Sequence, residues 1–307
     1  MGFNHSDVSN WKSIVMKEKI GMYLQLTKPK VTLLNLLVGV TCFLLATFPS
    51  VNWVNLAVFC VAGYLACGGC GALNCVYDRD HDKLMRRTSR RAIPSGTVSA
   101  SKGLIFGAII TSAGMSISYF FFNALTTLMI VLGAVFYLLV YTVILKRKSS
   151  WNVVIGGTAG CFAALSGWTA VAGSLSLVPV LVSTVDFLWT PGHLWGLAIK
   201  KAAEYKKAGI PMLPVTKGLK KTAKITFLFN MAAIASTLAL PVLGLTGLPY
   251  FLFAFSSGAW FLFESRKLLL VPSEANGFRV FLASMPYLAL LMTGLLVDKL
   301  FSAGTLV

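Results

Sequence analysis

Three oxygen-bearing side chains recur at four-residue intervals in the segment Asn74-x-x-x-Asp78-x-x-x-Asp82. On an α-helix, successive members of such a series rotate by about 40°, so all three lie on one face. Carboxylates at positions i and i+4 repel each other unless a cation bridges them. Oxygen-only ligands favour Mg²⁺ over zinc, and Mg²⁺ in an incomplete protein shell usually binds substrate phosphate. The spacing therefore predicts a Mg²⁺ and diphosphate site, with Asp80 on another face of the helix.

A run of basic residues follows the acidic series directly: Lys83, Arg86, Arg87, Arg90 and Arg91. Arginine binds phosphate oxygens through two parallel hydrogen bonds, and lysine adds a point charge. A second interpretation is that the acids form a solvated helix end and the arginines bind anionic lipid. Regular acidic spacing next to a basic loop favours the phosphate site.

A second group of chemically active residues lies in another apolar run, which contains Asp186, Trp189, Pro191, Gly192 and His193. An ionisable residue inside a membrane segment indicates a functional site, because burying it in lipid is costly. The Pro-Gly pair would bend the helix and free backbone carbonyl groups beside His193. Two alternatives stay open: Asp186 is protonated or paired within the bundle, and His193 is a packed, hydrogen-bonded residue.

Glu204 and Tyr205 come eleven and twelve residues after His193 and are surrounded by lysines. Lysines at this position typically mark the cytoplasmic side of a membrane protein. Glu204 either completes a second metal site or pairs with the neighbouring lysines, and the sequence favours neither interpretation.

The elements that position these residues are apolar segments of membrane-spanning length. The chain has 307 residues, of which 56% are hydrophobic and 12% are charged, with a mean hydropathy of +0.76. A soluble domain has about twice that share of charged residues. We therefore predict an all-α membrane bundle with a central cavity capped by cytoplasmic loops. Its nine predicted spans are 31–49, 53–76, 103–121, 124–145, 152–173, 177–199, 223–244, 248–265 and 280–298.

Basic residues alternate from gap to gap between these spans. Of the 27 Lys and Arg residues, 26 lie in the N-terminal segment 1–30 or in the segments 77–102, 146–151, 200–224 and 266–279, each of which follows an even-numbered span, and Lys299 is the exception. The positive-inside rule then predicts a cytoplasmic N-terminus and an external C-terminus in a plasma or inner membrane. Because the basic residues are confined to these gaps, anionic lipid and topology explain the net charge of +17 better than nucleic acid does.

The whole chain, 1–307, is predicted to form one transmembrane domain, with a cytoplasmic segment 1–30 and active-site loops 77–102 and 200–222. The loop 77–102 follows the second span, and the loop 200–222 follows the sixth span, four spans later. This spacing hints at an internal parallel repeat. Glycines in the second and fifth spans indicate close helix contacts, and we interpret Cys67-Gly-Gly-Cys70 as part of such packing rather than as a metal site.

Several segments carry a resemblance to a known family. The segment from Asn74 to Thr88 resembles the signature of the UbiA-type intramembrane prenyltransferase superfamily. Within it, the closest resemblance is to the protoheme IX farnesyltransferases. The agreeing segments are Leu26-Thr-Lys-Pro-Lys30, Trp189-x-Pro-x-His193, Glu204-Tyr-x-x-Ala-Gly-Ile-Pro-Met-Leu-Pro-Val215 and Met285-Pro-Tyr287. Two positions depart from the family: Glu204 stands where Asp is usual, and Ala92 where Pro is usual.

The resemblance implies a nine-helix enzyme that transfers a farnesyl group from farnesyl diphosphate to a vinyl group of protoheme IX. Water addition then gives heme O. It assigns Mg²⁺ to Asn74, Asp78, Asp82 and Glu204. It also implies that four basic residues neutralise the leaving diphosphate: Lys30, Arg87, Arg90 and Arg91.

The remaining assignments concern the heme and the allylic cation. The resemblance makes Tyr77, Asp186, Trp189, His193 and Tyr205 candidates for binding them, and Trp195 is a further aromatic candidate. Catalytic roles fall to Asp78, Asp82 and His193, where His193 would bind or orient the heme or line the site of attack. The implied partners are farnesyl diphosphate, protoheme IX and the lipid bilayer, and the sequence identifies no protein that delivers heme.

Two competing functions follow from the same residues. One is a related prenyltransferase that acts on a quinone precursor or a lipid headgroup. The other is a membrane transporter with Asp186 as its coupling residue, which fits poorly with three oxygen ligands beside an arginine cluster.

Overall fold

A computed structural model describes the backbone of residues 5–301 and the side chains of residues 16–301, and this part of the chain is helical without strands. The helices are α1 (His5–Leu26), α2 (Pro29–Thr47), α3 (Trp53–Lys83), α4 (Ala100–Phe121), α5 (Ala124–Val135), η1 (Phe136–Leu145, a π-helix), α6 (Asn152–Ala172), α7 (Leu177–Lys200), α8 (Ala202–Lys207), α9 (Leu213–Val242), α10 (Leu248–Leu270) and α11 (Glu274–Phe301). The all-α class is confirmed.

Each predicted span overlaps one long helix, with α5 and η1 together forming the fourth. Seven of these described helices are long and apolar enough to cross a membrane. The exceptions, α7 and α10, interleave apolar residues with Ser, Trp and charged residues, which lowers their hydropathy. A multi-pass membrane bundle is therefore confirmed, while the count of nine crossings stays a prediction.

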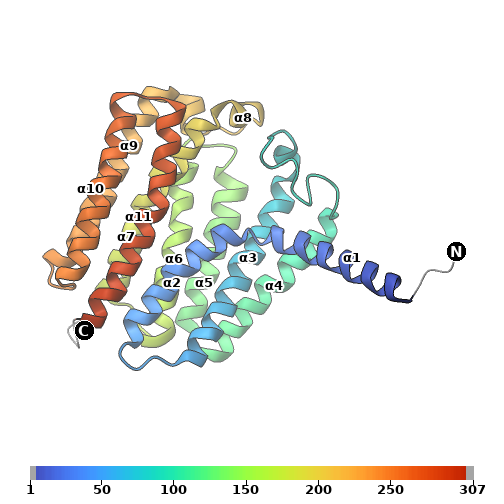
Figure 1. Ribbon diagram of the computed structural model, residues 1–307, viewed down its shortest axis with the longest axis horizontal. Helices are drawn as coiled ribbons and strands as arrows, with labels where there is room; N and C mark the ends of the chain where they lie inside the picture. The colour runs from blue at the N-terminus through green and yellow to red at the C-terminus, as the bar shows by residue number, and fades with distance from the viewer. Residues whose placement is uncertain (1–4, 302–307) are drawn as a thin grey trace.

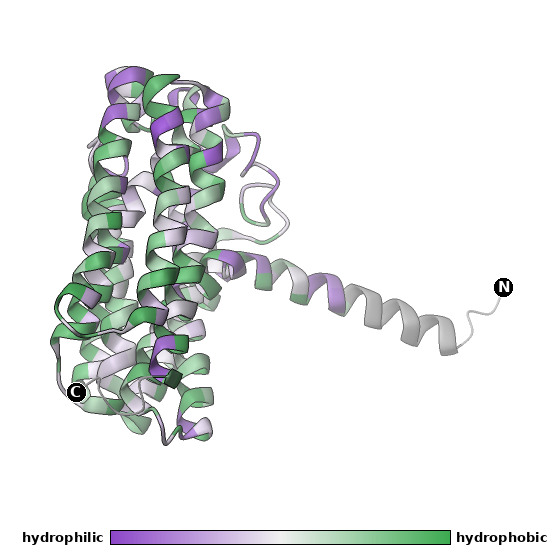
Figure 2. Cartoon of the chain, turned by 60° about the vertical axis from the view of Figure 1, so that its left-hand side comes forward, coloured by the Kyte–Doolittle hydropathy of each residue, from purple (hydrophilic) through white to green (hydrophobic). Residues whose placement is uncertain are grey.

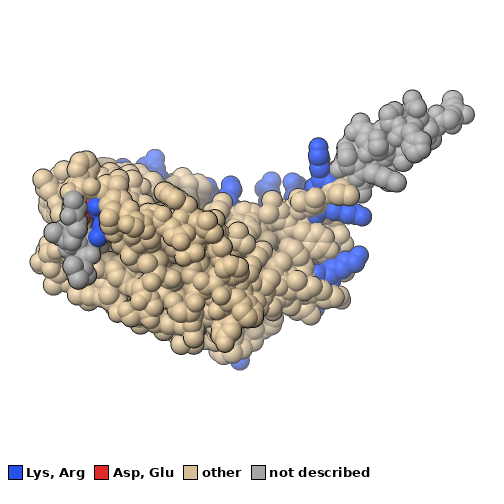
Figure 3. Space-filling view, turned by 90° about the horizontal axis from the view of Figure 1, so that it is seen from below, with Lys and Arg blue, Asp and Glu red and all other residues tan. Residues whose placement is uncertain are grey.

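The long helices lie side by side in one bundle, and its two ends differ in character (Figure 1). The long loop 84–99 and the short helix α8 lie at one end, and short connections close the other. Figure 2 shows α1 meeting the bundle from the side rather than joining it. Seen from the end with short connections, the surface carries Lys and Arg mainly at its margins (Figure 3). The basic stretches 86–91 and 200–207 lie in loop 84–99 and at α8, at the other end of the bundle.

Glycines allow several helices to approach at backbone distance, as the sequence predicts for the second and fifth spans. A Cβ atom at Gly69 of α3 would lie 2.2 Å from Thr111 Oγ1 of α4. A Cβ atom at Gly167 of α6 would lie 1.9 Å from the carbonyl oxygen of Gly39 of α2. Such contacts replace the hydrophobic effect as the packing force between helices in lipid.

The Gly167→Ala variant tests this packing. The added methyl group has to displace the backbone of α2, because a carbonyl oxygen occupies its position. Overpacking of this kind costs about 1–3 kcal/mol, so the detergent-solubilised variant should unfold at a lower temperature than the wild type. Gly21→Ala is the matched control, since no atom lies within 4 Å of its Cβ position. Equal unfolding temperatures for both variants would contradict the close α2–α6 contact.

Candidate functional site

The acidic series lies on the last turns of α3. This helix has 31 residues, well beyond the ~20 that span a bilayer. Asn74, Asp78 and Asp82 are each only 2% exposed and share the face toward the bundle. Asp80 points outward, with its side chain 65% exposed beside Arg79 and Lys83. The predicted facing of the series is confirmed.

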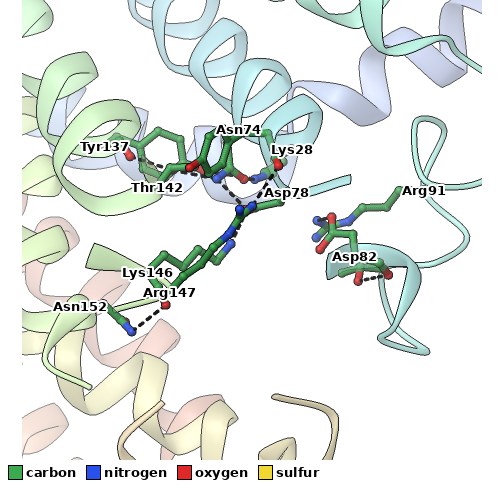
Figure 4. A network of polar contacts seen from close by, with 12 residues as sticks. Lys28, Asn74, Asp78, Asp82, Arg91, Tyr137, Thr142, Lys146, Arg147 and Asn152 are labelled. Carbon is green, nitrogen blue, oxygen red and sulfur yellow. Dashed lines mark hydrogen bonds and ion pairs between the residues drawn. The ribbon is translucent and has the colours of Figure 1, made fainter. Parts of the chain in front are cut away.

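Asp78 lies at the centre of a polar network drawn in Figure 4. Its Oδ2 atom contacts the ammonium group of Lys146 and accepts a hydrogen bond of 2.9 Å from Asn74 Nδ2. Its Oδ1 atom lies 3.5 Å from Arg147 Nη2. Burial alone would lower the pKa of Lys146, but the neighbouring Tyr141 and Asp78 raise it above its ordinary value. Lys146 therefore acts as a cation in this network.

The π-helix η1 places the partners of α3. π-helical turns are rare and occur mainly at functional sites. Within η1, Thr142 donates a hydrogen bond to the carbonyl of Tyr137 and accepts one of 2.9 Å from Asn74 Nδ2. Just beyond it, buried Asn152 donates to the carbonyls of Lys146 and Ser149 and braces the turn. Two residues 68 positions apart, Asn74 and Thr142, are thereby joined.

Lys28 reaches the same network from the joint between α1 and α2. Its backbone is left-handed, with φ of 50°, a conformation that costs about 1–2 kcal/mol outside glycine. Its ammonium group contacts Asn74 Oδ1 and lies 3.1 Å from the hydroxyl group of Tyr137. Burial lowers the pKa of Lys28, so an anion beside it would stabilise its charged form. Lys30, in contrast, is exposed on the outer side of α2.

Asp82 is held by the loop that follows α3. Arg91 Nη1 donates to Asp82 Oδ2 at 2.9 Å, and the hydroxyl group of Thr88 donates to the Asp82 carbonyl. Arg87 and Arg90 are exposed in the same loop. The structure therefore brings one of the four predicted phosphate-binding residues, Arg91, to the acids.

Three cationic side chains thus pair with the two carboxylates, Arg91 with Asp82 and both Lys146 and Arg147 with Asp78. Lys28 adds a fourth basic group beside them at Asn74. The sequence interpretation missed Lys28, Lys146 and Arg147. The only signal for them was their place at the ends of apolar spans, where basic residues also serve topology. An excess of cations over carboxylates in a buried setting favours binding of a polyvalent anion.

The donor set also fits Mg²⁺. Asp78 Oδ1 is buried and accepts no hydrogen bond from the described residues, so it has a lone pair available for a cation. Asn74 and Asp82 add amide and carboxylate oxygens on the same face. Within the described part of the chain, no three His, Cys, Asp or Glu side chains come together. Substrate oxygens would therefore have to complete the shell.

Glu204 lies on α8, at the end of the bundle that carries loop 84–99. Its carboxylate accepts hydrogen bonds from Lys201 Nζ at 2.8 Å and from the Arg87 backbone at 3.5 Å. The hydrogen bond from Lys201 lowers the pKa of Glu204. This pairing matches the lysine-bound alternative for Glu204, and its role as a metal ligand stays a prediction.

The candidate residues of α7 lie outside the network of Figure 4, because α7 packs on α6, α9 and α11. Asp186 is buried, and its Oδ2 would be 2.3 Å from a Cβ atom at Gly160 of α6. His193 stacks on Trp189, with ring centroids 4.4 Å apart, and its Nδ1 lies 2.6 Å from Ser284 Oγ. This packed setting agrees with both alternatives given above: Asp186 is protonated or paired within the bundle, and His193 is a packed, hydrogen-bonded residue.

The other aromatic candidates have different surroundings. The ring of Tyr77 is covered by the Arg147 guanidinium group at 4.4 Å. Tyr205 is buried in an apolar cluster with Met85 and Trp195 that fixes α8 to α7. Trp195 is fully buried against Trp151 and Phe229. Its environment is that of a core residue, which makes it a poor candidate for the face of an allylic cation.

Comparison with known proteins places this arrangement in a family. The model of the UbiA prenyltransferase family matches residues 33–291. The chain belongs to the UbiA prenyltransferase family. It is 38% identical over 283 residues to protoheme IX farnesyltransferase 1 of Cenarchaeum symbiosum, a match that covers 91% of this chain and 95% of that protein. The predicted superfamily is thereby confirmed, and the chain is a prenyltransferase.

Two further relatives of this UbiA-family chain carry the same name. Protoheme IX farnesyltransferase of a Nostoc species is 40% identical over 283 residues, covering 92% of this chain and 89% of that protein. The protein of that name from Roseiflexus castenholzii is 38% identical over 277 residues and covers 90% of this chain. The chain spans about half, 52%, of the length of the Roseiflexus protein.

Solved structures agree on the fold of this UbiA-family chain. A structure described as a digeranylgeranylglyceryl phosphate synthase in membranes superposes with a TM-score of 0.73 at 18% identity, covering 92% of this chain and 99% of that one. A UbiA homolog from Archaeoglobus fulgidus, bound to DMAPP and Mg²⁺, gives 0.66 at 15% identity, covering 90% and 99%. At these identities the likeness establishes the fold alone.

Proposed function

We propose that this chain transfers the farnesyl group of farnesyl diphosphate to a vinyl group of protoheme IX, giving heme O and diphosphate. The observation that carries the proposal is the pairing of Asp78 and Asp82 with three cationic side chains, with Lys28 beside them at Asn74, at one end of a membrane bundle. A site of this charge suits a diphosphate whose hydrocarbon chain extends into the apolar bundle. The names of the relatives support farnesyl as the group transferred and heme as the acceptor.

Binding uses the acids and the cations in different ways. Asn74, Asp78 and Asp82 would hold Mg²⁺, which when bound supplies positive charge to the departing diphosphate. Lys146 and Arg147 then exchange a carboxylate partner for diphosphate oxygens. Arg91 makes the same exchange at Asp82, and its fork suits two oxygens at once. Such donors act most strongly in a site that excludes water.

The reaction breaks the bond between C1 of the farnesyl group and the bridging oxygen, and the electron pair leaves with diphosphate. The vinyl double bond supplies the pair for the new carbon–carbon bond. Water adds to the resulting cation and a proton is released, so the products are heme O, diphosphate and one proton. Tyr77 directly precedes Asp78 in the sequence, and its ring already stacks with the Arg147 guanidinium group, so it is an aromatic candidate for stabilising the allylic cation.

The orientation that we propose for the enzyme in the membrane rests on the basic loops at this end of the bundle. The basic loops that carry Arg91 and Lys146 would face the cytoplasm of a plasma or inner membrane, with the N-terminus on that side and the C-terminus outside. Both substrates would then enter from the cytoplasmic leaflet, where the apolar chain is already dissolved.

A second candidate acceptor is a lipid headgroup. We include it because the fold resembles that of a structure described as a digeranylgeranylglyceryl phosphate synthase. One experiment separates the two acceptors directly. Purified protein is incubated with farnesyl diphosphate, Mg²⁺ and one acceptor: protoheme IX, an aromatic acid or a glycerol phosphate lipid. We expect a farnesylated product from protoheme IX alone, detected by mass spectrometry, and its loss with excess EDTA. A product from either other acceptor alone would refute the heme assignment.

A further inference from the structure

A pair of helices that the diphosphate site does not use, α7 and α11, meet around a fully buried serine. Ser284 of α11 has 0% exposure and makes two contacts with α7. Its carbonyl oxygen accepts a hydrogen bond of 2.8 Å from Trp189 Nε1, and its hydroxyl oxygen lies 2.6 Å from His193 Nδ1. Nearby, Gly196 and Gly277 bring the two backbones close enough that a Cβ atom on Gly196 would lie 2.8 Å from the Gly277 carbonyl. The helices are therefore fixed against each other at this level.

The direction of the serine–histidine hydrogen bond follows from the third partner. Ser284 donates its only hydroxyl proton to the carbonyl of Phe281, at 2.7 Å. With the hydroxyl proton on that carbonyl, the hydroxyl oxygen accepts from His193, and this arrangement places the proton of the neutral imidazole on Nδ1. Nε2 is left with its lone pair, and no hydrogen bond in the described part of the chain reaches it.

The plane of this imidazole is fixed as well. Trp189 stacks on it at 4.4 Å with an angle of 17° between the rings, and Phe281 packs at 4.6 Å with an angle of 32°. Both ring faces are thus covered, and the ring edge carries the only unused polar atom. His193 is half-buried, not sealed in the core. An imidazole with an oriented, unprotonated nitrogen is the usual protein ligand of heme iron.

We propose that Nε2 of His193 binds the iron of the heme substrate and that Ser284 is the positioning residue that holds His193 in the required tautomer. This inference rests on the proposed function, because it needs heme as the acceptor. It adds two residues outside the diphosphate site to substrate binding. Removing the group that hydrogen-bonds to the second nitrogen of a metal-ligating histidine typically lowers metal affinity about 10- to 100-fold.

The test is a heme titration of the purified full-length protein, followed by absorption spectroscopy. Wild type should give the spectrum of a nitrogen-ligated heme, and His193→Ala should lose it. Ser284→Ala should weaken heme binding by about tenfold or more. Ser257→Ala is the matched control, because Ser257 is also buried and donates to the carbonyl four residues before it, at 2.6 Å, without touching a histidine.

A second variant removes any dependence on the folding of Ser284→Ala. In His193→Gly, added imidazole should restore the nitrogen-ligated spectrum at a lower concentration than 1-methylimidazole, which has no N–H group to donate to Ser284. Equal rescue by both compounds, or an unchanged spectrum in His193→Ala, overturns the inference and leaves heme as the acceptor. Absence of heme binding by the wild type would instead overturn the proposed function.

Discussion

Asp78→Asn should lower prenyl transfer on the order of 10²- to 10³-fold while the protein remains folded. The substitution keeps the size of the side chain and its hydrogen bonds within the network but removes the charge that faces Lys146 and Arg147. Loss of one electrostatic group from a preorganised site has effects of this size. The measurement is diphosphate release by detergent-solubilised enzyme, with the unfolding temperature recorded for the same preparation.

The asparagine variant is preferable to alanine because Asp78 is buried among cations. Alanine would remove the acceptor oxygen that Asn74 and Lys146 contact and would leave a cavity in addition to the lost charge, so that variant would mix unfolding with lost chemistry. Asp80→Asn serves as the control, since Asp80 is two residues away and exposed on the opposite side of α3. It should keep nearly full activity. Similar losses in both variants would contradict the assignment of the inner face as the metal face.

Lys146→Met should have opposite effects on two measurements. Turnover should fall on the order of 10²-fold, because the variant lacks a cation that neutralises the leaving diphosphate. Binding of Mn²⁺ as a magnetic substitute for Mg²⁺, measured by electron paramagnetic resonance without substrate, should become tighter. The reason is that Lys146 contacts Asp78 Oδ2, an oxygen that a metal ion would otherwise bind.

Lys148→Met provides the comparison, since Lys148 lies two residues further along the same basic turn but is exposed. It should change neither turnover nor Mn²⁺ affinity by more than about twofold, the usual range for a surface charge. Should Lys146→Met bind Mn²⁺ no better than the wild type, then the lysine does not compete with the metal for Asp78. The proposed exchange of partners would then be wrong.

The sequence predicted the parts of the site that depend on local geometry. The shared face of Asn74, Asp78 and Asp82 follows from helical periodicity alone, and α3 has that regular periodicity. It also predicted Arg91, which is nine residues from its partner Asp82. The order of the long helices was equally accessible, because apolar length and basic gaps are properties of the chain itself.

The missing cations depend on contacts that no local pattern encodes. Lys28 and Asn74 are 46 residues apart, and Asp78 and Lys146 are 68 apart. The family resemblance pointed to Lys30, but Lys28, whose backbone is left-handed, is the residue that contacts Asn74, and Lys30 is exposed. The π-helix Phe136–Leu145 has more residues per turn than an α-helix. A period of 3.6 residues therefore assigns the side chains after Val135, including Lys146, to the wrong face of the helix.

The sideways approach of α1 has a mechanical consequence. The joint that ends this helix carries Lys28, whose ammonium group contacts Asn74 of α3. A change in the angle between α1 and α2 would therefore displace that ammonium group from Asn74 and from the hydroxyl group of Tyr137.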